Sequence, residues 1–338
     1  MTLAVIWFIL LFVLLGGYAV LDGFDLGVGA IHLLAKDENE RRVSINAIGP
    51  VWDGNEVWLL TGGGALFAAF PAVYATVFSG FYLALMVVLM CLMFRAIAME
   101  FRGKVDSAKW RGVWDVAFSV SSILLPVLFG VAFGNVLRGV PLAADGTYSG
   151  TFLGLLNPYA VLIGVLTLVT FAMHGAIFLA GKSDGRMQLR LVRIAVRAWG
   201  AFVLLFVLTT VATALAAPAL FQHDGINFAA WLFMIVIVAA CFALPGLIRA
   251  HRFKTAMFAS GGLVASLMGL AASGLFPRLL PSITEPGASL TIYNASSTPR
   301  TLAVMLVIAL IGMPLVIVYT AFIYRVFHGK VVLSEDSY

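Results

Sequence analysis

Two carboxylates stand inside otherwise apolar sequence and are the residues best suited to chemistry. Asp22 and Asp25 lie three positions apart in a glycine-rich stretch, and apolar residues continue on both sides of them. In a helix, that spacing places both side chains on one face. A charged side chain at the centre of a membrane costs about 2.5 to 3.5 kcal/mol, so such residues are typical of proton paths and transport sites. The pair therefore predicts a buried site that handles protons.

Five more ionisable residues stand near the ends of the neighbouring apolar runs: Asp53, Glu56, Arg95, Glu100 and Asp115. Asp53 and Glu56 repeat the spacing of three. One interpretation is a proton-uptake route, in which partly buried carboxylates pass protons inward. The other is a set of interfacial ion pairs with arginines, whose long side chains reach the headgroup layer. Both interpretations stay open from the sequence.

Histidine can ligate haem iron, and only His174 lies well inside an apolar run. A chain that held several haems would need several such residues. A buried imidazole also needs only one hydrogen-bond partner to be satisfied. We therefore weigh His174 as a haem ligand against a hydrogen-bonded packing residue and favour packing. Cys91 and Cys241 match no metal-binding spacing, so the sequence predicts no metal site.

The elements that must position these residues are membrane helices. Of the 338 residues, 62% are hydrophobic and 11% are charged, whereas a soluble domain has about 25% charged residues. A bilayer core of about 30 Å requires about 20 apolar residues per helix. Nine runs qualify: 3–34, 57–76, 78–100, 113–136, 158–181, 194–217, 228–249, 255–276 and 302–327. The sequence predicts an all-α integral membrane protein with about nine transmembrane helices.

The lysines and arginines predict the orientation of these helices. With the N-terminus outside and the C-terminus in the cytoplasm, all but three of them fall on the cytoplasmic side. The exceptions are Arg138, Arg278 and Arg300. Basic residues in short loops are retained on that side of the membrane. Their short groups at helix ends also argue against a nucleic-acid partner.

A short internal repeat suggests how the helices are grouped. Five of eight positions are identical between residues 29–36 and 175–182, and both segments end a predicted helix on the same side. We expect a single membrane domain over 1–338, with four-helix units at 1–136 and 158–276 and an extra peripheral helix at 302–327. Chance is the competing explanation, because small apolar residues are common in this chain.

Several segments resemble the subunit II proteins of cytochrome bd and cyanide-insensitive quinol oxidases. The densest are 22–29 (DGFDLGVG) and 50–59 (PVWDGNEVWL), followed by 130–135 (GVAFGN) and 289–297 (SLTIYNASS). The resemblance covers nearly the whole chain. It implies a subunit of a quinol oxidase of the bacterial cytoplasmic (inner) membrane, in which quinol is oxidised and oxygen is reduced to water.

The resemblance also implies cofactors and partners. Haem b and haem d would be held by a haem-carrying subunit I, and none would be ligated by this chain. A small single-helix subunit is a further candidate partner, and a structural quinone or a lipid is a candidate ligand between the helices.

Some residue roles follow from the same resemblance. Asp25, Trp52 and Asp53 would form part of a proton pathway, with Arg95 as a nearby polar partner, and Trp58 would lie near a route for oxygen. From their positions, Asp22 and Glu56 join the same pathway. Glu56 departs from the family, because an uncharged amide is common there.

Two other functions compete with the oxidase subunit. A proton-coupled secondary transporter would also need many spans, buried carboxylates and glycine-rich helices, and it would act without a partner. A purely structural scaffold would stabilise a haem subunit without conducting protons. In that case, substitutions of the carboxylates would change assembly alone.

Overall fold

The computed structural model describes residues 2–221 and 227–333. In these residues, eight helices are each long and apolar enough to cross a membrane, and the number is nine if a bent pair of helices is counted as one crossing. The eight are α1 (Thr2–Ile31), α5 (Tyr82–Phe101), α6 (Ala108–Arg138), α7 (Pro158–Lys182), α8 (Gly185–Ala216), α9 (Phe228–Arg249), α10 (Phe253–Leu275) and α11 (Pro299–Val326). The prediction of an all-α membrane protein with about nine crossings is confirmed.

The bent pair corrects one predicted helix. The run 57–76 is instead two helices, α3 (Trp52–Ala69) and α4 (Pro71–Gly80), which meet at 120°. The break lies at Phe70, because Pro71 cannot donate a backbone hydrogen bond and moves the preceding residue out of helical geometry. The turn predicted near residue 77 is therefore wrong, and α4 is a short separate helix.

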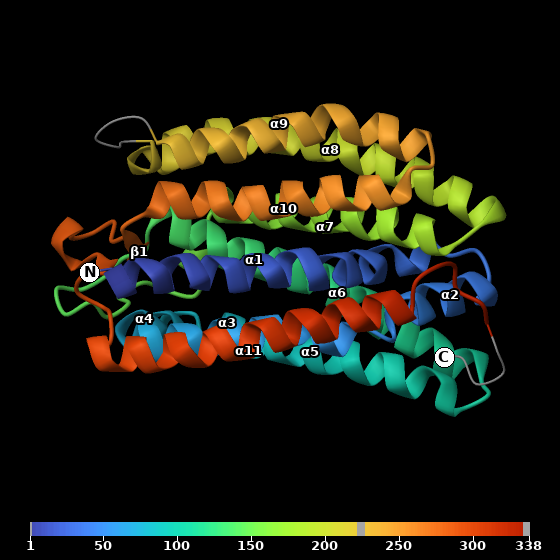
Figure 1. Ribbon diagram of the computed structural model, residues 1–338, viewed down its shortest axis with the longest axis horizontal. Coiled ribbons are helices and arrows are strands. Elements are labelled where there is room, and N and C mark those ends of the chain that lie inside the picture. The colour runs from blue at the N-terminus through green and yellow to red at the C-terminus, as the bar shows by residue number, and fades with distance from the viewer. Residues whose placement is uncertain (1, 222–226, 334–338) are drawn as a thin grey trace.

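The long helices run side by side along one axis (Figure 1). The beginning of α1 and the end of α11 lie at opposite ends of the bundle, and the short helix α2 (Glu38–Ile48) lies at the end where α11 finishes. Figure 1 also shows α7 to α10 on one side of α1, and α3, α5 and α11 on the other. The division into two four-helix units stays a prediction.

The helix α1 is central to the bundle and packs against α3, α6, α7 and α10. Its crossing with α7 is the closest, because glycines meet there. A Cβ atom at Gly27 would lie 1.8 Å from the Phe171 carbonyl oxygen, and one at Gly175 would lie 2.4 Å from the Gly27 carbonyl carbon. Small residues at such crossings let two backbones touch, which is a main source of helix association in membranes.

The loops cover the end of the bundle where α1 begins. They contain the antiparallel strands β1 (Arg278–Leu280) and β2 (Leu290–Thr291) and the 3-10 turns η3 (Leu153–Leu156), η4 (Pro218–Leu220) and η5 (Pro286–Ala288). Two further turns, η1 (His32–Leu34) and η2 (Arg102–Lys104), follow α1 and α5. Ser297 donates from its hydroxyl to the Ala68 carbonyl at 2.6 Å. The segment before α11 therefore packs on α3 of the same chain.

The glycine crossing supports a test of the fold. Gly27→Ala places a methyl group against the α7 backbone, so the two helices must separate. We expect about 1 to 3 kcal/mol of destabilisation, measured as a lower Tm and a lower yield in detergent. Gly200→Ala is the control, because no atom lies within 4 Å of that Cβ position. Equal Tm values for the two variants would contradict the packing described.

Candidate functional site

A buried ion pair joins α1 to α5. Arg95 donates from Nη1 to Oδ2 of Asp22 at 2.9 Å and from Nη2 to Oδ1 at 2.5 Å. Both side chains are fully buried. Glu56 of α3 lies next to the pair, with its Oε2 atom 3.9 Å from Nη1 of Arg95 and its side chain 21% exposed. A bidentate ion pair of this kind fixes the relative orientation of the two side chains in addition to the attraction between their charges.

Asp25 has one paired and one unpaired oxygen. Its Oδ2 atom accepts from Nδ2 of Asn55 at 2.8 Å, and its Oδ1 atom has no hydrogen-bond partner in the described chain. Asn55 also donates to the Leu21 carbonyl, and its Oδ1 atom accepts from the hydroxyl of Tyr324 at 3.1 Å. The carboxyl of Asp25 is fully buried. It can therefore receive a proton at Oδ1 without breaking a hydrogen bond.

Sequence reasoning missed Asn55 and Tyr324. Asn55 was visible in the segment 50–59, between Asp53 and Glu56, but an amide carries no charge and gave no signal there. Tyr324 is 269 positions away from Asn55, so no local spacing could have linked the two residues.

More polar atoms around the pair are buried without a partner in the described chain. They are Nε of Arg95 and Nε1 of Trp58. Tyr18 interacts electrostatically with Asp22, Arg95 and Glu56, so it belongs to the same cluster. Buried polar groups are normally satisfied by protein or by ordered water. The cluster is therefore a polar interior between α1, α3 and α5.

The remaining predicted pathway residues lie outside this cluster. Asp53 is exposed at the beginning of α3, and it acts electrostatically on Glu56. Trp52 is half-buried and packs against the apolar core. The ring of Trp58 rests on Gly17, where a Cβ atom would lie 2.3 Å from Cε3. The structure thus brings together Asp22, Asp25, Glu56 and Arg95. Asp53 lies outside this group and is exposed at the beginning of α3.

Comparisons with known proteins place this chain in a family. The sequence model for cytochrome bd terminal oxidase subunit II matches residues 3–327. Cytochrome bd-I ubiquinol oxidase subunit 2 of Escherichia coli (strain K12) is 37% identical, with 98% of this chain and 95% of that protein covered. The chain belongs to the cytochrome bd terminal oxidase subunit II family.

A second relative and a solved structure agree with this. Cytochrome bd ubiquinol oxidase subunit 2 of Bacillus subtilis (strain 168) is 39% identical, with 98% of this chain and 97% of that protein covered. A chain of the bd oxidase from Geobacillus thermodenitrificans has the same fold, with a TM-score of 0.80 at 19% identity. The structural match covers 97% of this chain and 99% of the Geobacillus chain. The family resemblance stated from the sequence is confirmed.

A second cluster of this subunit II chain pairs both oxygens of Asp115. Asp115 accepts from Arg102 Nε at 2.6 Å and from Arg41 Nη1 at 2.9 Å, and its Oδ1 atom lies 2.7 Å from Nε2 of His32. The side chain of Asp115 is 1% exposed. Arg102 also donates to Glu38 at 2.8 Å. These contacts support the ion-pair interpretation for Asp115, which ties η1, α2, α6 and η2 together.

A further ion pair, on the surface of the bundle, joins α2 to α8. Glu40 of α2 accepts hydrogen bonds from Arg190 of α8 and from the Lys36 backbone. Partial burial acts to raise the pKa of the Glu40 carboxyl, but these bonds and the two positive charges outweigh it and lower the pKa. The carboxylate form is therefore favoured, and α2 is held to α8 by charge.

Both ring nitrogens of His174 have hydrogen-bond partners. Nδ1 lies 2.7 Å from the Ser260 hydroxyl, and Nε2 lies 3.0 Å from the Val20 carbonyl oxygen. Because a carbonyl only accepts, Nε2 carries the proton. The Ser260 hydroxyl, which lies against Nδ1, also donates to the Met257 carbonyl at 3.1 Å. The ring is fully buried. This geometry favours the packing interpretation, since haem ligation would break one of the two contacts.

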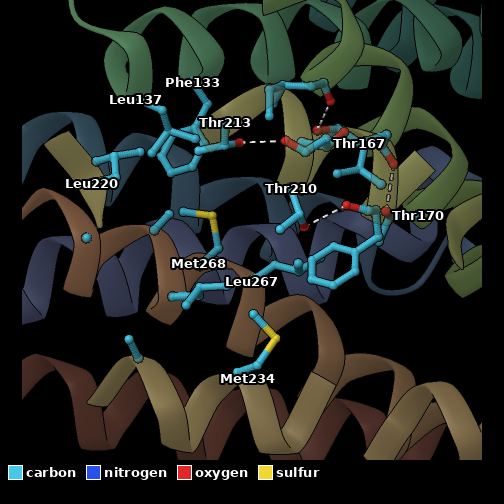
Figure 2. A pocket seen from close by; sticks show the side chains of 18 of the residues that line it. Phe133, Leu137, Thr167, Thr170, Thr210, Thr213, Leu220, Met234, Leu267 and Met268 are labelled. Carbon is cyan, nitrogen blue, oxygen red and sulfur yellow. Dashed lines mark hydrogen bonds between the residues drawn. The ribbon is translucent and has the colours of Figure 1, made fainter. Parts of the chain in front are cut away.

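A cavity with a volume of about 610 Å³ lies between α7, α8, α9 and α10. Figure 2 shows Thr167, Thr170 and Thr210 on one side and Met234 and Met268 on the other. Most of the lining is apolar, and the hydroxyl of Thr209, which also lines the cavity, is buried without a partner in the described chain. An apolar cavity of this size with few polar groups is typical of a small-molecule site.

The paired cluster around Asp115 gives a test of its structural role. Asp115→Asn leaves two arginines without their buried carboxylate, so we expect a loss of about 3 to 5 kcal/mol and a clear fall in Tm. Asp106→Asn is the control, because Asp106 pairs with Arg111 while being fully exposed. Its Tm should change little, since surface pairs contribute about 0 to 1 kcal/mol. If Asp115→Asn melts like the control, the cluster is not structural.

Proposed function

We propose that this chain is the second subunit of a bacterial quinol oxidase that reduces oxygen to water. Its membership of the subunit II family supports this, as do relatives named as subunits of ubiquinol oxidases. The partner is a haem-carrying subunit I, in which haem b and haem d supply the electron transfer to oxygen. His174 does not fit a haem ligand, because both of its ring nitrogens are engaged.

The proposed orientation has the beginning of α1 outside the cell and the end of α11 in the cytoplasm. Nearly all lysines and arginines lie at or near the ends of helices that finish or begin on the α2 side of the bundle. Basic residues are retained on the cytoplasmic side. Asp53 and Glu56 then lie on the cytoplasmic half of α3.

The chain also supplies part of the proton-uptake route. Protons pass from Asp53 at the surface to Glu56 and then to Asp25, while Asp22 and Arg95 stay paired as a fixed charge. Asp22 is a poor carrier, because protonation would break two charge-assisted hydrogen bonds from Arg95. Asp25 is a good carrier, because its Oδ1 atom has no partner to lose among the described residues. This part of the proposal depends on a single observation, which is that the buried Oδ1 atom of Asp25 has no hydrogen-bond partner among the described residues.

Ordered water connects the groups that are too far apart for direct contact. Nε of Arg95 is buried without a partner in the described part of the chain, and water can satisfy it. Trp52 forms part of the wall on the cytoplasmic side. Trp58, which rests on α1, lines an apolar route for oxygen next to the proton route.

Asp25→Asn tests the proton route. An amide cannot carry a proton, so we expect turnover and charge separation to fall about ten-fold or more in the complex reconstituted in vesicles. Haem content is measured alongside and should stay full. Asp106→Asn, an exposed carboxylate away from the route, is the control. Normal turnover and normal charge separation with full haem would rule out the route.

The two competing functions predict different results. A purely structural scaffold predicts that Asp25→Asn lowers haem content and turnover together. A transporter predicts that the chain moves a solute in vesicles without a haem subunit. Loss of charge separation at full haem content is expected from the proton route alone.

The cavity between α7, α8, α9 and α10 holds a structural quinone or a lipid. Its volume and apolar lining suit an isoprenoid or acyl chain, and the Thr209 hydroxyl can donate to a carbonyl oxygen of the headgroup. Loss of such a donor leaves a ligand carbonyl unpaired, which weakens binding.

Thr209→Val tests this site. Valine keeps the shape and removes the donor, so we expect the quinone or lipid that copurifies with the complex to fall about three- to ten-fold. Thr210→Val is the control, because the Thr210 hydroxyl already donates to the Phe206 carbonyl. Mass spectrometry of the extracted complex measures both variants. An unchanged ligand content in Thr209→Val would exclude the proposed donor.

A further inference from the structure

We infer that Tyr324 of α11 is a positioning residue for the proton-carrying oxygen of Asp25 and that it acts through the amide of Asn55. The inference rests on the proposed role of Asp25 and deepens it. It gives α11, which leaves most of its surface outside the bundle, a task in the proton route.

The orientation of Asn55 is fixed by its neighbours. Its Nδ2 atom lies 2.8 Å from Oδ2 of Asp25 and 3.2 Å from the Leu21 carbonyl oxygen. A backbone carbonyl accepts and never donates, so the amide nitrogen must face α1. The amide oxygen then faces the opposite way, toward the hydroxyl of Tyr324 at 3.1 Å. Tyr324 therefore donates, and Asn55 accepts.

This arrangement selects one oxygen of Asp25. Oδ2 accepts from Asn55 whether the carboxyl is charged or neutral, so the proton must reside on Oδ1. Asn55 is 2% exposed, and without Tyr324 its amide oxygen would be buried and unpaired. The amide would then be free to shift, and the donor to Oδ2 would weaken. Hydrogen bonds in a chain strengthen one another, so Tyr324 also strengthens the contact that it does not make.

The position of Tyr324 is secured by contacts at the end of α11. One turn beyond it, the Phe327 carbonyl accepts from Nζ of Lys182 at 2.5 Å. The backbone N–H of Val331 donates to the Lys182 carbonyl at 2.9 Å. The ring of Tyr324 meets the ring of Phe24 edge-on, with centroids 6.3 Å apart. An otherwise exposed helix is thus fastened to α7 where its tyrosine meets the site.

The test uses redox-difference infrared spectra of the assembled complex. The carbonyl band of protonated Asp25 is assigned by its loss in Asp25→Asn. In Tyr324→Phe we expect this band to move to higher frequency, because Oδ2 loses a well-placed donor. We also expect turnover to fall about three- to ten-fold at full haem content, the loss that one buried hydrogen bond gives. Tyr319→Phe is the matched control, since Tyr319 lies on the same helix and is 60% exposed.

A second pair of variants tests whether Tyr324 acts through Asn55. Asn55→Leu removes the amide, so Tyr324→Phe should have no further effect in the double variant. Effects that multiply would overturn the inference. A ring-fluorinated tyrosine at position 324 keeps the shape and strengthens the donor. It should move the band to lower frequency, and it replaces Tyr324→Phe if that variant lowers the haem content.

The outcomes separate this inference from the proposed function. A band that is present in the unchanged complex and does not move in the Tyr324 variants would overturn the inference and leave the role of Asp25 intact. If the unchanged complex has no band that Asp25→Asn removes, the proposed carrier is wrong and the inference falls with it.

Discussion

The buried pair of Asp22 and Arg95 is the constraint on which the rest of the site depends. A guanidinium that is fully removed from water is tolerated only because two short hydrogen bonds and an opposite charge compensate it. Yet three carboxylates, those of Asp22, Asp25 and Glu56, surround this one cation. Asp22 uses both of its oxygens on Arg95, so a proton is the simplest compensation for the others. Because Arg95 is already paired with Asp22, the pair favours protonation of the carboxylates beside it.

The position of α1 makes this arrangement possible. Its glycines at 23 and 27 meet Phe171 and the backbone of α7, while its carboxylates face α3 and α5. One helix therefore carries close packing on one face and polar chemistry on another. A helix at the edge of the bundle could not do both, because its polar face would lie in lipid, where unpaired polar groups are costly.

The sequence predicted what depends on local pattern and missed what depends on contacts. Run lengths predicted the crossings, since the bilayer sets one length for all of them. Hydropathy did not reveal the bend at Phe70, because both sides of it are apolar. Position within the apolar runs separated Asp22, which is fully buried, from Asp53, which is exposed. The contact of Tyr324 with Asn55 was not predicted, because it joins residues that only folding brings together.

Hydrogen bonding distinguishes two buried aspartates that share residue type, depth and nearby arginines. Asp115 has partners on both oxygens, from Arg41, Arg102 and His32, and any added proton would displace one of them. In the part of the chain that the structure describes, Asp25 has a partner on one oxygen alone. A fully paired carboxylate resists protonation and serves to hold helices together, whereas a half-paired one can exchange a proton while the structure around it stays in place. In the proposed proton route, the difference between the structural carboxylate of Asp115 and the conducting carboxylate of Asp25 is therefore one oxygen that has no partner among the described residues.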